Sequence, residues 1–405
     1  MKVPEGWRST RIGAEVATYS GGTPRRDESS YYGGDIPWIK SGELNGGAVF
    51  STSESITKEG LRNSSARMVE AGTLLLALYG ATAGVPAISH IDAAINQAIL
   101  AIRPMDTLDR MYLYHWLCMS REAVVAKYTQ GGQPNLSADL VRSLRISLPP
   151  LPEQRKIAEI LGTWDEAIAL VERRLAAARA RKRGLMQRLL TGQVRFPGFT
   201  EPWREVRLGE LGHCLRGVSY KPDDLRATDG TDTVRLLRAN NIVTDGLDLT
   251  SIQIVDAARA KKAQFLRAGD IAICMSSGSH DLVGKASAYH DSDGQKYVVG
   301  AFCAIYRPLR RADASLVEQI FQSEVYRRQI LVLGAGTNIR NLKPSDIEGI
   351  MLRLPSVPLE RERIAAVLGT CDAKIGQLTA KLTALQAQKK GLMQRLLTGE
   401  VRVRV

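Results

Sequence analysis

Residues 148–168 read LPPLPEQRKIAEILGTWDEAI, and residues 354–375 read LPSVPLERERIAAVLGTCDAKI. After one inserted residue the two copies stay in step, 207 positions apart, through GLMQRLLTG at 184–192 and again at 391–399. A shared segment of this length indicates that one structural unit occurs twice in the chain.

A second, weaker match lies upstream of each copy. Trp7 followed by Ile12-Gly13 corresponds to Trp203 followed by Leu208-Gly209. The order is therefore variable block, helix, variable block, helix, which predicts a pseudo-two-fold molecule. Such a molecule suits a partner with two-fold character, and DNA is the foremost example.

The repeat divides the chain into four segments: a variable domain at 1–149, a helix at 150–195, a second variable domain at 196–353, and a second helix at 354–405. The predicted fold class is α+β (mixed α/β), in which two variable domains alternate with two long helices. We expect these helices to pair as an antiparallel coiled coil.

Composition is typical of a soluble globular chain with room for two or three domains. No apolar run approaches the roughly 20 residues that span a bilayer, and residues 1–13 lack the apolar stretch of a secretory signal. The five cysteines form no C-x-x-C pair. These features predict a cytoplasmic protein with reduced thiols and no membrane contact.

The positive charge is concentrated on the repeated segments. The net charge is +13, and segments 150–195 and 354–405 each contribute +5, against +1 and +2 for the two variable blocks. Most of the excess lies in the second halves of the two helices, as at Arg173 and Arg181 in the first. A solvated helical face and a surface that meets phosphate or an acidic protein both remain open.

The repeated helices have an apolar period of 3.5 residues, which is typical of a coiled-coil seam. The predicted seam comprises Ile157, Leu161, Trp164, Ile168, Val171, Leu175, Leu185 and Leu189 in the first helix and Ile364, Leu368, Ile375, Leu378, Leu382, Leu385, Leu392 and Leu396 in the second. Lys182 and Lys389 interrupt the seam at equivalent positions. A polar residue there can fix the register, but we prefer the interpretation that each lysine turns its charged end out to solvent.

The ends of both helices carry helix-start and helix-stop signals. Pro152 and Pro358 suit a first helical turn, and Gly192 and Gly399 suit the exit from a helix. About 39 residues at 1.5 Å each give a rod of about 58 Å. Pairing between chains is possible, but one shared period and length favour pairing within the chain.

Each variable block predicts short strands, Gly-rich turns and one later helix, at 110–128 and 314–333. Polar residues cluster in the loops that end the strands. Arg and Lys pair with guanine edges, Asn and Gln pair with adenine, and all four contact phosphate. The candidate DNA contacts are Gly21, Thr23, Lys40, Ser41, Gln133, Asn135, Arg216, Lys221, Arg238, Asn240, Asn241, Ser276, Lys285, Asn338 and Arg340.

Catalytic and metal-binding motifs are missing from the sequence. The five histidines show no metal-ligand spacing, and residues 278–286 resemble a phosphate loop with one residue too many and Ala at the metal-binding position. We therefore expect a non-catalytic chain without a cofactor or metal of its own. The alternatives are an enzyme with unfamiliar motifs and a coiled-coil protein–protein adaptor without DNA readout.

Several of these motifs, taken together, resemble the specificity (S) subunit of type I restriction–modification systems. The resemblance covers essentially the whole chain and rests on SGGTP at 20–24, IPWIK at 36–40, QPNLS at 133–137, LPPLPEQR at 148–155, and the LTG that ends both helices. The second block departs from this pattern, because it has GVS in place of GGTP and lacks the Pro-Trp of IPWIK.

The resemblance implies a function and a set of partners. Each variable block would be a target-recognition domain that reads one half of a bipartite, asymmetric sequence in double-stranded DNA. The helices would set the gap between the half-sites and dock two methyltransferase subunits. S-adenosylmethionine, ATP and Mg would then belong to the methyltransferase and motor-nuclease partner subunits.

Overall fold

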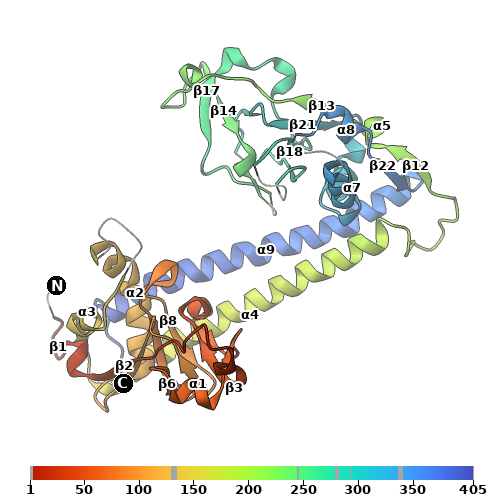
Figure 1. Cartoon of the computed structure of the whole chain (residues 1–405). Coiled ribbons are helices and arrows are strands. Elements are labelled where there is room, and N and C mark those ends of the chain that lie inside the picture. The colour runs from red at the N-terminus through yellow and green to blue at the C-terminus, as the bar shows by residue number, and fades with distance from the viewer. Residues whose placement is uncertain are drawn as a thin grey trace. The chain divides into compact units, whose positions relative to one another are not determined.

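The structure, a computed structural model, describes residues 3–128, 135–243, 246–278, 282–291, 293–335 and 341–404. The chain divides into two compact units, and each unit combines one variable block with part of each repeated helix (Figure 1). Unit 1 comprises Met1–Glu172 and Ala380–Val405, and unit 2 comprises Arg173–Thr379. The mixed α/β fold class is confirmed.

The two repeated segments form the long helices α4 (Leu151–Leu189) and α9 (Pro358–Leu397), of 39 and 40 residues. Pro358 is the first residue of its helix. Gly192 and Gly399 follow the helix ends with φ angles of 72° and 73°. Because this left-handed conformation strains other residues, glycine is required where the chain leaves each helix.

Unit 1 contains two main sheets. Their strand orders are β2-β10-β7-β8-β4 and β5-β3-β9-β6, and β1 pairs with β11. The strands are β1 (Arg8–Arg11), β2 (Val16–Ser20), β3 (Tyr32–Ile39), β4 (Ala48–Val49), β5 (Ser55–Ile56), β6 (Arg67–Val69), β7 (Leu74–Ala77), β8 (Pro86–Ser89), β9 (Ala93–Ile95), β10 (Ile99–Pro104) and β11 (Arg145–Leu148). The shorter helices are α1 (Lys58–Arg62), α2 (Arg110–Tyr128) and α3 (Ala138–Ser143).

Unit 2 repeats this plan with the sheets β13-β21-β18-β19 and β17-β14-β20, while β12 pairs with β22 and β15 with β16. The strands are β12 (Arg204–Arg207), β13 (Gly212–Arg216), β14 (Thr233–Leu237), β15 (Ile242–Val243), β16 (Gly246–Leu247), β17 (Gln253–Asp256), β18 (Ile271–Cys274), β19 (Ala286–Ala288), β20 (Tyr297–Val299), β21 (Cys303–Pro308) and β22 (Met351–Leu354). The shorter helices are α5 (Leu208–Leu211), α6 (Ala314–Phe321), α7 (Glu324–Ala335) and α8 (Pro344–Glu348).

The central strands are apolar on both faces because each face belongs to a different core. In β7, Leu74 and Leu76 join one buried cluster, while Leu75 and Ala77 join another. Strand β18 alternates in the same way between two clusters of unit 2. A strand covered on both sides reads as a continuous hydrophobic run, which explains the apolar stretches LLLA and IAIC.

The prediction of one helix at 314–333 is wrong. Two helices, α6 and α7, replace it, with a break at Gln322 and Ser323. The Ser323 hydroxyl donates to the Ile320 carbonyl (2.6 Å) and accepts from the Tyr326 amide (3.3 Å). Such local hydrogen bonds of serine compete with the helical pattern and start a new helix.

Parts of the long helices belong to the core of each unit. Ile157, Leu161 and Leu396 join the cluster of unit 1 that contains Trp7, and Leu189, Ile364 and Leu368 join the main cluster of unit 2. The predicted seam residues are buried or half-buried throughout, as the 3.5-residue period requires. By contrast, basic residues of α4 such as Arg173, Arg181 and Arg188 are exposed.

The preference for solvent-facing seam lysines is wrong. The Lys182 ammonium bonds Asp372 on the facing helix (2.5 Å) and the side-chain Oε1 of Gln322 (2.6 Å), and its side chain is only 9% exposed. In unit 1, Lys389 pairs with Asp165 in the equivalent way. A lysine that finds a carboxylate across the seam has no need to reach solvent, so the register interpretation gains support.

These ion pairs also give the direction of the helices within each unit. In unit 1 the partners of Glu153 and Asp165 are Arg402 and Lys389, so α4 rises in number as the facing segment falls. In unit 2 Lys182 pairs with Asp372, and Arg195 with Glu360, in the same reversed order. Within each unit the two helical segments are therefore antiparallel.

Candidate nucleic-acid interface

In unit 1, backbone hydrogen bonds join the loops that end the strands. The Gly22 amide donates to the Ile95 carbonyl (3.0 Å), and the Asn96 amide donates to the Ile39 carbonyl (3.1 Å), just before Lys40. Further along, the Leu78 amide donates to the Ala98 carbonyl (2.8 Å). The loops after β2, β3 and β7 thus lie beside the loop between β9 and β10, at one end of the sheets.

Side-chain and strand contacts complete this group in unit 1. The Thr23 hydroxyl donates to Gln97 Oε1 (2.5 Å), and Tyr79 forms a β-bridge with Asn135. The structure therefore brings Gly21, Thr23, Lys40, Ser41 and Asn135 to one end of the unit. We call this group of loops the unit 1 loop face.

Unit 2 has backbone hydrogen bonds equivalent to the three of unit 1. The Val218 amide donates to Val299 (2.7 Å), the Gly300 amide to Leu237 (2.8 Å), and the Met275 amide to Phe302 (2.8 Å). Ser276 forms a β-bridge with Asn341, as Tyr79 does with Asn135. We call these loops the unit 2 loop face.

The predicted residues of unit 2 lie on or beside this face. Arg238, Asn240 and Ser276 line one pocket. Arg216 ends β13 and Lys221 follows Tyr220, so both flank the segment 217–220, and Lys285 follows the turn at Gly284. Three further predicted contacts fall outside the described residues: Gln133, Asn338 and Arg340.

Gly21 and its counterpart Gly217 have a packing role. A Cβ on Gly21 would lie 1.8 Å from the Ile95 carbonyl oxygen, and one on Gly217 would lie 2.1 Å from the Gly300 carbonyl oxygen. Only glycine lets the two backbones approach so closely. A DNA contact of Gly21 stays a prediction, while its fit against β9 is evident.

Asn241 is withdrawn from the predicted DNA contacts. Its side chain is 0% exposed. Its oxygen accepts from the Arg238 amide (2.8 Å), and its nitrogen donates to the carbonyls of Asp248 (2.8 Å) and Ser251 (2.9 Å). With three hydrogen bonds and no exposure, it shapes the loop that presents Arg238 and cannot reach a base.

The two faces differ in how their principal cation is balanced. Lys40 Nζ bonds Glu54 (2.5 Å), which also pairs with Arg26 (2.8 Å). These two cations, Lys40 first, lower the pKa of the Glu54 carboxyl. Arg238, at the position equivalent to Lys40, forms no ion pair with any described residue.

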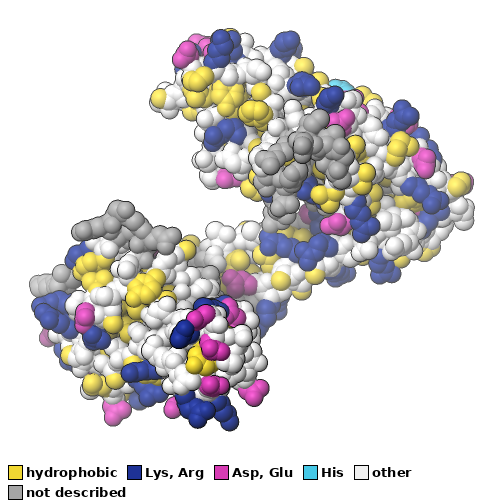
Figure 2. Space-filling view, in the orientation of Figure 1, with side chains coloured by type: hydrophobic (Ala, Val, Ile, Leu, Met, Phe, Trp, Pro, Cys, Tyr) yellow, Lys and Arg dark blue, Asp and Glu magenta, His cyan; other side chains and the backbone are white. Residues whose placement is uncertain are grey.

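Figure 2 shows basic and acidic side chains interspersed over both units. Local pairing, rather than the overall charge, therefore decides where positive charge is available to an anion. The unpaired Arg238 makes the unit 2 face the more attractive of the two for phosphate or an electron-rich base edge.

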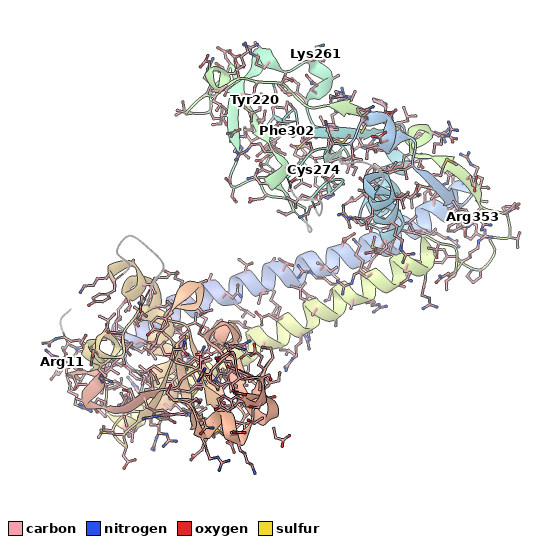
Figure 3. The ribbon with its side chains drawn as sticks, in the orientation of Figure 1. Arg11, Tyr220, Lys261, Cys274, Phe302 and Arg353 are labelled. Carbon is pink, nitrogen blue, oxygen red and sulfur yellow. The ribbon has the colours of Figure 1, made fainter. Side chains whose placement is uncertain are left out.

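Sequence reasoning missed three residues of the loop faces. Gln97 bonds Thr23 in unit 1, and Tyr220 and Phe302 line the pocket of unit 2, where Figure 3 shows them close together. The available signal was position: Gln97 and Phe302 sit in matching loops before the strands β10 and β21. Phe302 lies in the apolar run VVGAFCAI, so the sequence pattern predicts a buried residue, although Phe302 is exposed.

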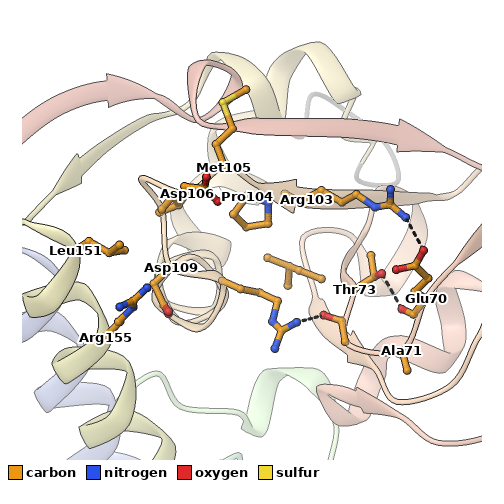
Figure 4. A pocket seen from close by; sticks show the side chains of 15 residues that line it. Glu70, Ala71, Thr73, Arg103, Pro104, Met105, Asp106, Asp109, Leu151 and Arg155 are labelled. Carbon is orange, nitrogen blue, oxygen red and sulfur yellow. Dashed lines mark hydrogen bonds and ion pairs between the residues drawn. The ribbon is translucent and has the colours of Figure 1, made fainter.

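A second pocket, of about 610 Å³, lies in unit 1 at the opposite end of β10. Glu70, Asp109, Arg103, Arg110 and Arg155 contribute charges of both signs to it (Figure 4). Arg110 donates to the Gly72 carbonyl (2.6 Å), and Arg103 lies 3.9 Å from Glu70. Its cations are thus partly satisfied internally, and it contains none of the predicted contacts.

Neither a candidate metal site nor a helix able to span a membrane is present among the described residues. No cluster of three or more His, Cys, Asp or Glu side chains is placed to hold a metal ion among the residues that the structure describes. Within the same residues, no helix has the length and apolar character needed to cross a bilayer.

Comparison with known proteins shows similarity to one family of proteins. Residues 4–179 match the family model described as type I restriction modification DNA specificity domain. The StySPI specificity subunit of Salmonella potsdam is 31% identical over 201 residues, which are 50% of this chain and 43% of that protein. The chain thus matches less than half the length of this relative.

Two further similarities extend over the whole chain. The MjaVIII specificity subunit of Methanocaldococcus jannaschii is 23% identical across 100% of this chain and 95% of its own length. The crystal structure of the type I S subunit from M. genitalium superposes with a TM-score of 0.63 at 15% identity, covering 98% of both chains, and so shares the fold. Residues 4–179 thus match a type I restriction modification DNA specificity domain, and the chain as a whole is similar to specificity subunits of type I restriction enzymes and shares the fold of a type I S subunit.

Proposed function

We propose that this chain is the non-catalytic subunit that gives a type I restriction–modification complex its DNA sequence specificity. The unit 1 loop face reads one half of a bipartite target and the unit 2 loop face reads the other. The helices α4 and α9 set the gap between the half-sites and dock two methyltransferase subunits. Motor-nuclease subunits complete the complex, and S-adenosylmethionine, ATP and Mg belong to these partners.

One observation carries the proposal: the same backbone scaffold presents two different sets of side chains. The hydrogen bonds of Gly22 and Val218 to the neighbouring strand are equivalent, yet Lys40 is replaced by Arg238. A sequence reader needs a fixed frame and variable contacts, because base edges are distinguished by the donors and acceptors that face them. Two different sets on one frame predict two different half-sites.

The length of the helices supports a role in spacing. A helix of 39 residues is about 58 Å long, which exceeds the roughly 34 Å of one turn of DNA. The seam ion pairs Lys182–Asp372 and Lys389–Asp165 oppose sliding of one helix along the other. A fixed register would give a fixed gap.

The test is sequencing of adenine methylation at single-molecule resolution in cells that express the methyltransferase partner with and without this chain. We expect a split, asymmetric motif that appears only when the chain is present. A methyltransferase that is active yet gives no chain-dependent motif would contradict the proposal and favour a protein–protein adaptor.

A single substitution assigns one half-site to unit 1. Lys40→Ala should relax recognition in one half of the motif only, because losing one base contact costs about 1–3 kcal/mol at that position. The matched control is Met105→Ala, an exposed residue just beyond the other end of β10, which should leave the motif unchanged. Equal relaxation of both halves would contradict the assignment.

A further inference from the structure

The unit 2 loop face contains a pocket of about 720 Å³. Tyr220, Arg238, Asn240, Ser276 and Phe302 are among its lining residues. In Figure 2 hydrophobic side chains gather on the surface of unit 2 over β14 and β17, and β17 contributes Gln253 to the lining of the pocket. Pockets that combine aromatic walls with a few polar groups are typical sites for planar organic ligands.

The aromatic walls are held in place before any ligand arrives. The Tyr220 hydroxyl donates to Gln253 Oε1 (2.8 Å), which fixes the ring at its far end. The Phe302 carbonyl accepts from the amides of Met275 (2.8 Å) and Ser276 (3.2 Å), so its backbone is anchored to β18. The Phe302 side chain is nevertheless 71% exposed. The Tyr220 ring, held at its hydroxyl, therefore loses little conformational freedom when a partner stacks on it, and the Phe302 ring is exposed for contact.

The Arg238 guanidinium group in this pocket has a hydrogen-bond donor without an acceptor among the described residues. The Nε atom of Arg238 is buried and has no hydrogen-bond acceptor in the described part of the chain. Buried donors are nearly always satisfied in folded proteins, so an unsatisfied one indicates that an acceptor is still to be supplied. The guanidinium group offers donors in a fixed fork, which fits two neighbouring acceptors on one planar edge.

Unit 1 does not repeat these features. The position of Phe302 is taken by Ala98, which is 8% exposed, and the position of Tyr220 is taken by Pro24, which is buried. The cation equivalent to Arg238 is Lys40, which Glu54 already neutralises. The combination of aromatic wall and unpaired guanidinium is therefore specific to the second reader.

We infer that this pocket receives one base of the half-site read by unit 2, turned out of the duplex stack. The base would lie against the rings of Tyr220 and Phe302, with its acceptor edge on Arg238. The inference rests on the proposed function, since it names how one of the two readers contacts its DNA.

Physical reasons favour a base that has left the stack. Both faces of a stacked base are covered by its neighbours, so a base that enters a pocket and lies against aromatic walls there has left the helix. Stacking on aromatic side chains then offsets the cost of unstacking. An edge with two adjacent acceptors, such as O6 and N7 of guanine, matches the donors of Arg238.

The experiment uses the complex of this chain with its methyltransferase partner and duplexes carrying the target identified by methylation sequencing. Each adenine of the second half-site is replaced in turn by 2-aminopurine and each cytosine by pyrrolocytosine, which fluoresce when unstacked. A guanine, whose O6 2-aminopurine lacks, is kept and is tested by 2-aminopurine or pyrrolocytosine at the adjacent position, which also brightens when its neighbour leaves the stack. Thymines are probed with permanganate, which oxidises unstacked thymine. The adenine that is methylated is an internal positive control, because methyltransferases themselves extrude their target base.

We expect one position, distinct from the methylated adenine, to give a signal several-fold above free DNA. Phe302→Ala should abolish this signal and weaken DNA binding about 10-fold, in line with the loss of one base–aromatic stack. The methylated adenine should still respond. Phe50→Ala, which truncates a phenylalanine of unit 1 that is 69% exposed, is the matched control and should change neither the signal nor the affinity.

The outcomes separate this inference from the proposed function. If the chain directs a methylation motif but no second position responds, or if the response survives in both Phe302→Ala and Tyr220→Ala, the inference is overturned and the proposed function stands. If no chain-dependent motif exists, the proposed function fails and the inference fails with it. Because Phe302 is exposed, its truncation should leave the melting temperature unchanged, so a lost signal cannot be attributed to unfolding.

Discussion

Unit 1 and unit 2 have matching backbones and differing side chains at their loop faces. Gly22 and Val218 make equivalent hydrogen bonds to β9 and β20, whereas Ala98 and Phe302 occupy matching positions with opposite exposure. The comparison teaches that the frame is fixed by strand pairing and by the buried cores. The side chains on the loops are then free to differ without cost to the fold.

In the long helices, by contrast, a side-chain interaction is also shared by the two units. Lys182 and Lys389 each bond an aspartate of the facing helix, so this interaction is present in both units. The surrounding partners differ: Asp372 accepts from Gln319 (2.8 Å), while Asp165 lies 3.7 Å from His115, and Lys182 also bonds Gln322. The parts that hold the frame are duplicated more faithfully than the parts that face a ligand.

The largest expected effect comes from breaking a seam ion pair. Asp372→Ala leaves the Lys182 ammonium, with its 9% exposed side chain, without a counter-charge and should lower the free energy of unfolding by about 3 kcal/mol. Asp165→Ala should have a similar effect through Lys389 if the two units are energetically equivalent. Urea unfolding monitored by circular dichroism measures both.

The matched control replaces both members of the pair. Lys182→Met combined with Asp372→Leu should be neutral or stabilising, because no charge remains to be desolvated. A loss of less than about 0.5 kcal/mol for Asp372→Ala would show instead that the pair behaves as an exposed one.

The next largest expected effect is a pH dependence of stability that arises from unit 1. Burial, and then the charge of Lys389, lowers the pKa of His115 to about 3, below the value of about 6.5 for an unfolded chain. Asp165 does not reverse this, since its charge is matched by Lys389. The unfolded state therefore binds the extra proton, and stability falls as the pH drops from 6.5 towards 3.

The substitution His115→Gln gives unit 1 the residue type that unit 2 has at the equivalent position, Gln319, and removes the titratable imidazole. At pH 7.5 the variant and the parent should respond to pH alike, whereas at pH 5 the parent should have lost about 2 kcal/mol relative to the variant. Thermal unfolding between pH 5 and 8 measures the difference. Parallel curves over this range would mean that His115 is accessible to protons in the folded chain.

The smallest effect concerns the cations of the loop faces. Glu54→Gln releases Lys40, so DNA affinity should rise by about 1 kcal/mol and the slope of log K against log salt should steepen by about 0.9. Arg238→Gln should do the reverse and flatten the slope by about 1. Titrations of the assembled complex at several salt concentrations measure both, and identical slopes for all three proteins would contradict the proposed contacts.

The sequence predicted the parts of the fold that have a strong period. The 3.5-residue seam located α4 and α9, and glycines 192 and 399 located their ends within three residues. Polar residues after short strands located both loop faces, because the ends of neighbouring strands meet in space. These features are local, so a single sequence contains them.

Features that depend on contacts between residues far apart in the sequence could not be predicted from the sequence alone. Lys182 forms its ion pair with Asp372, and Lys40 forms its ion pair with Glu54. The spacing of residues in the sequence indicates neither pair. Asn241 has the residue type of a base contact but is buried by hydrogen bonds to its own loop. Helix α6 ends at Phe321, and the role of Ser323 in the break that follows is evident only from the hydrogen bond of its hydroxyl to the Ile320 carbonyl.

The division of the long helices between the units has a consequence for the order in which the chain folds during synthesis. The core of unit 1 includes Met393 and Leu396, so the domain that is translated first stays incomplete until the last helix emerges. Unit 2 needs only residues 173–379 and can close earlier. At about 5–20 residues per second, unit 1 waits on the order of 10–50 s with part of its apolar surface uncovered. A ribosome-bound chain should therefore be protected from proteolysis in its second half before its first.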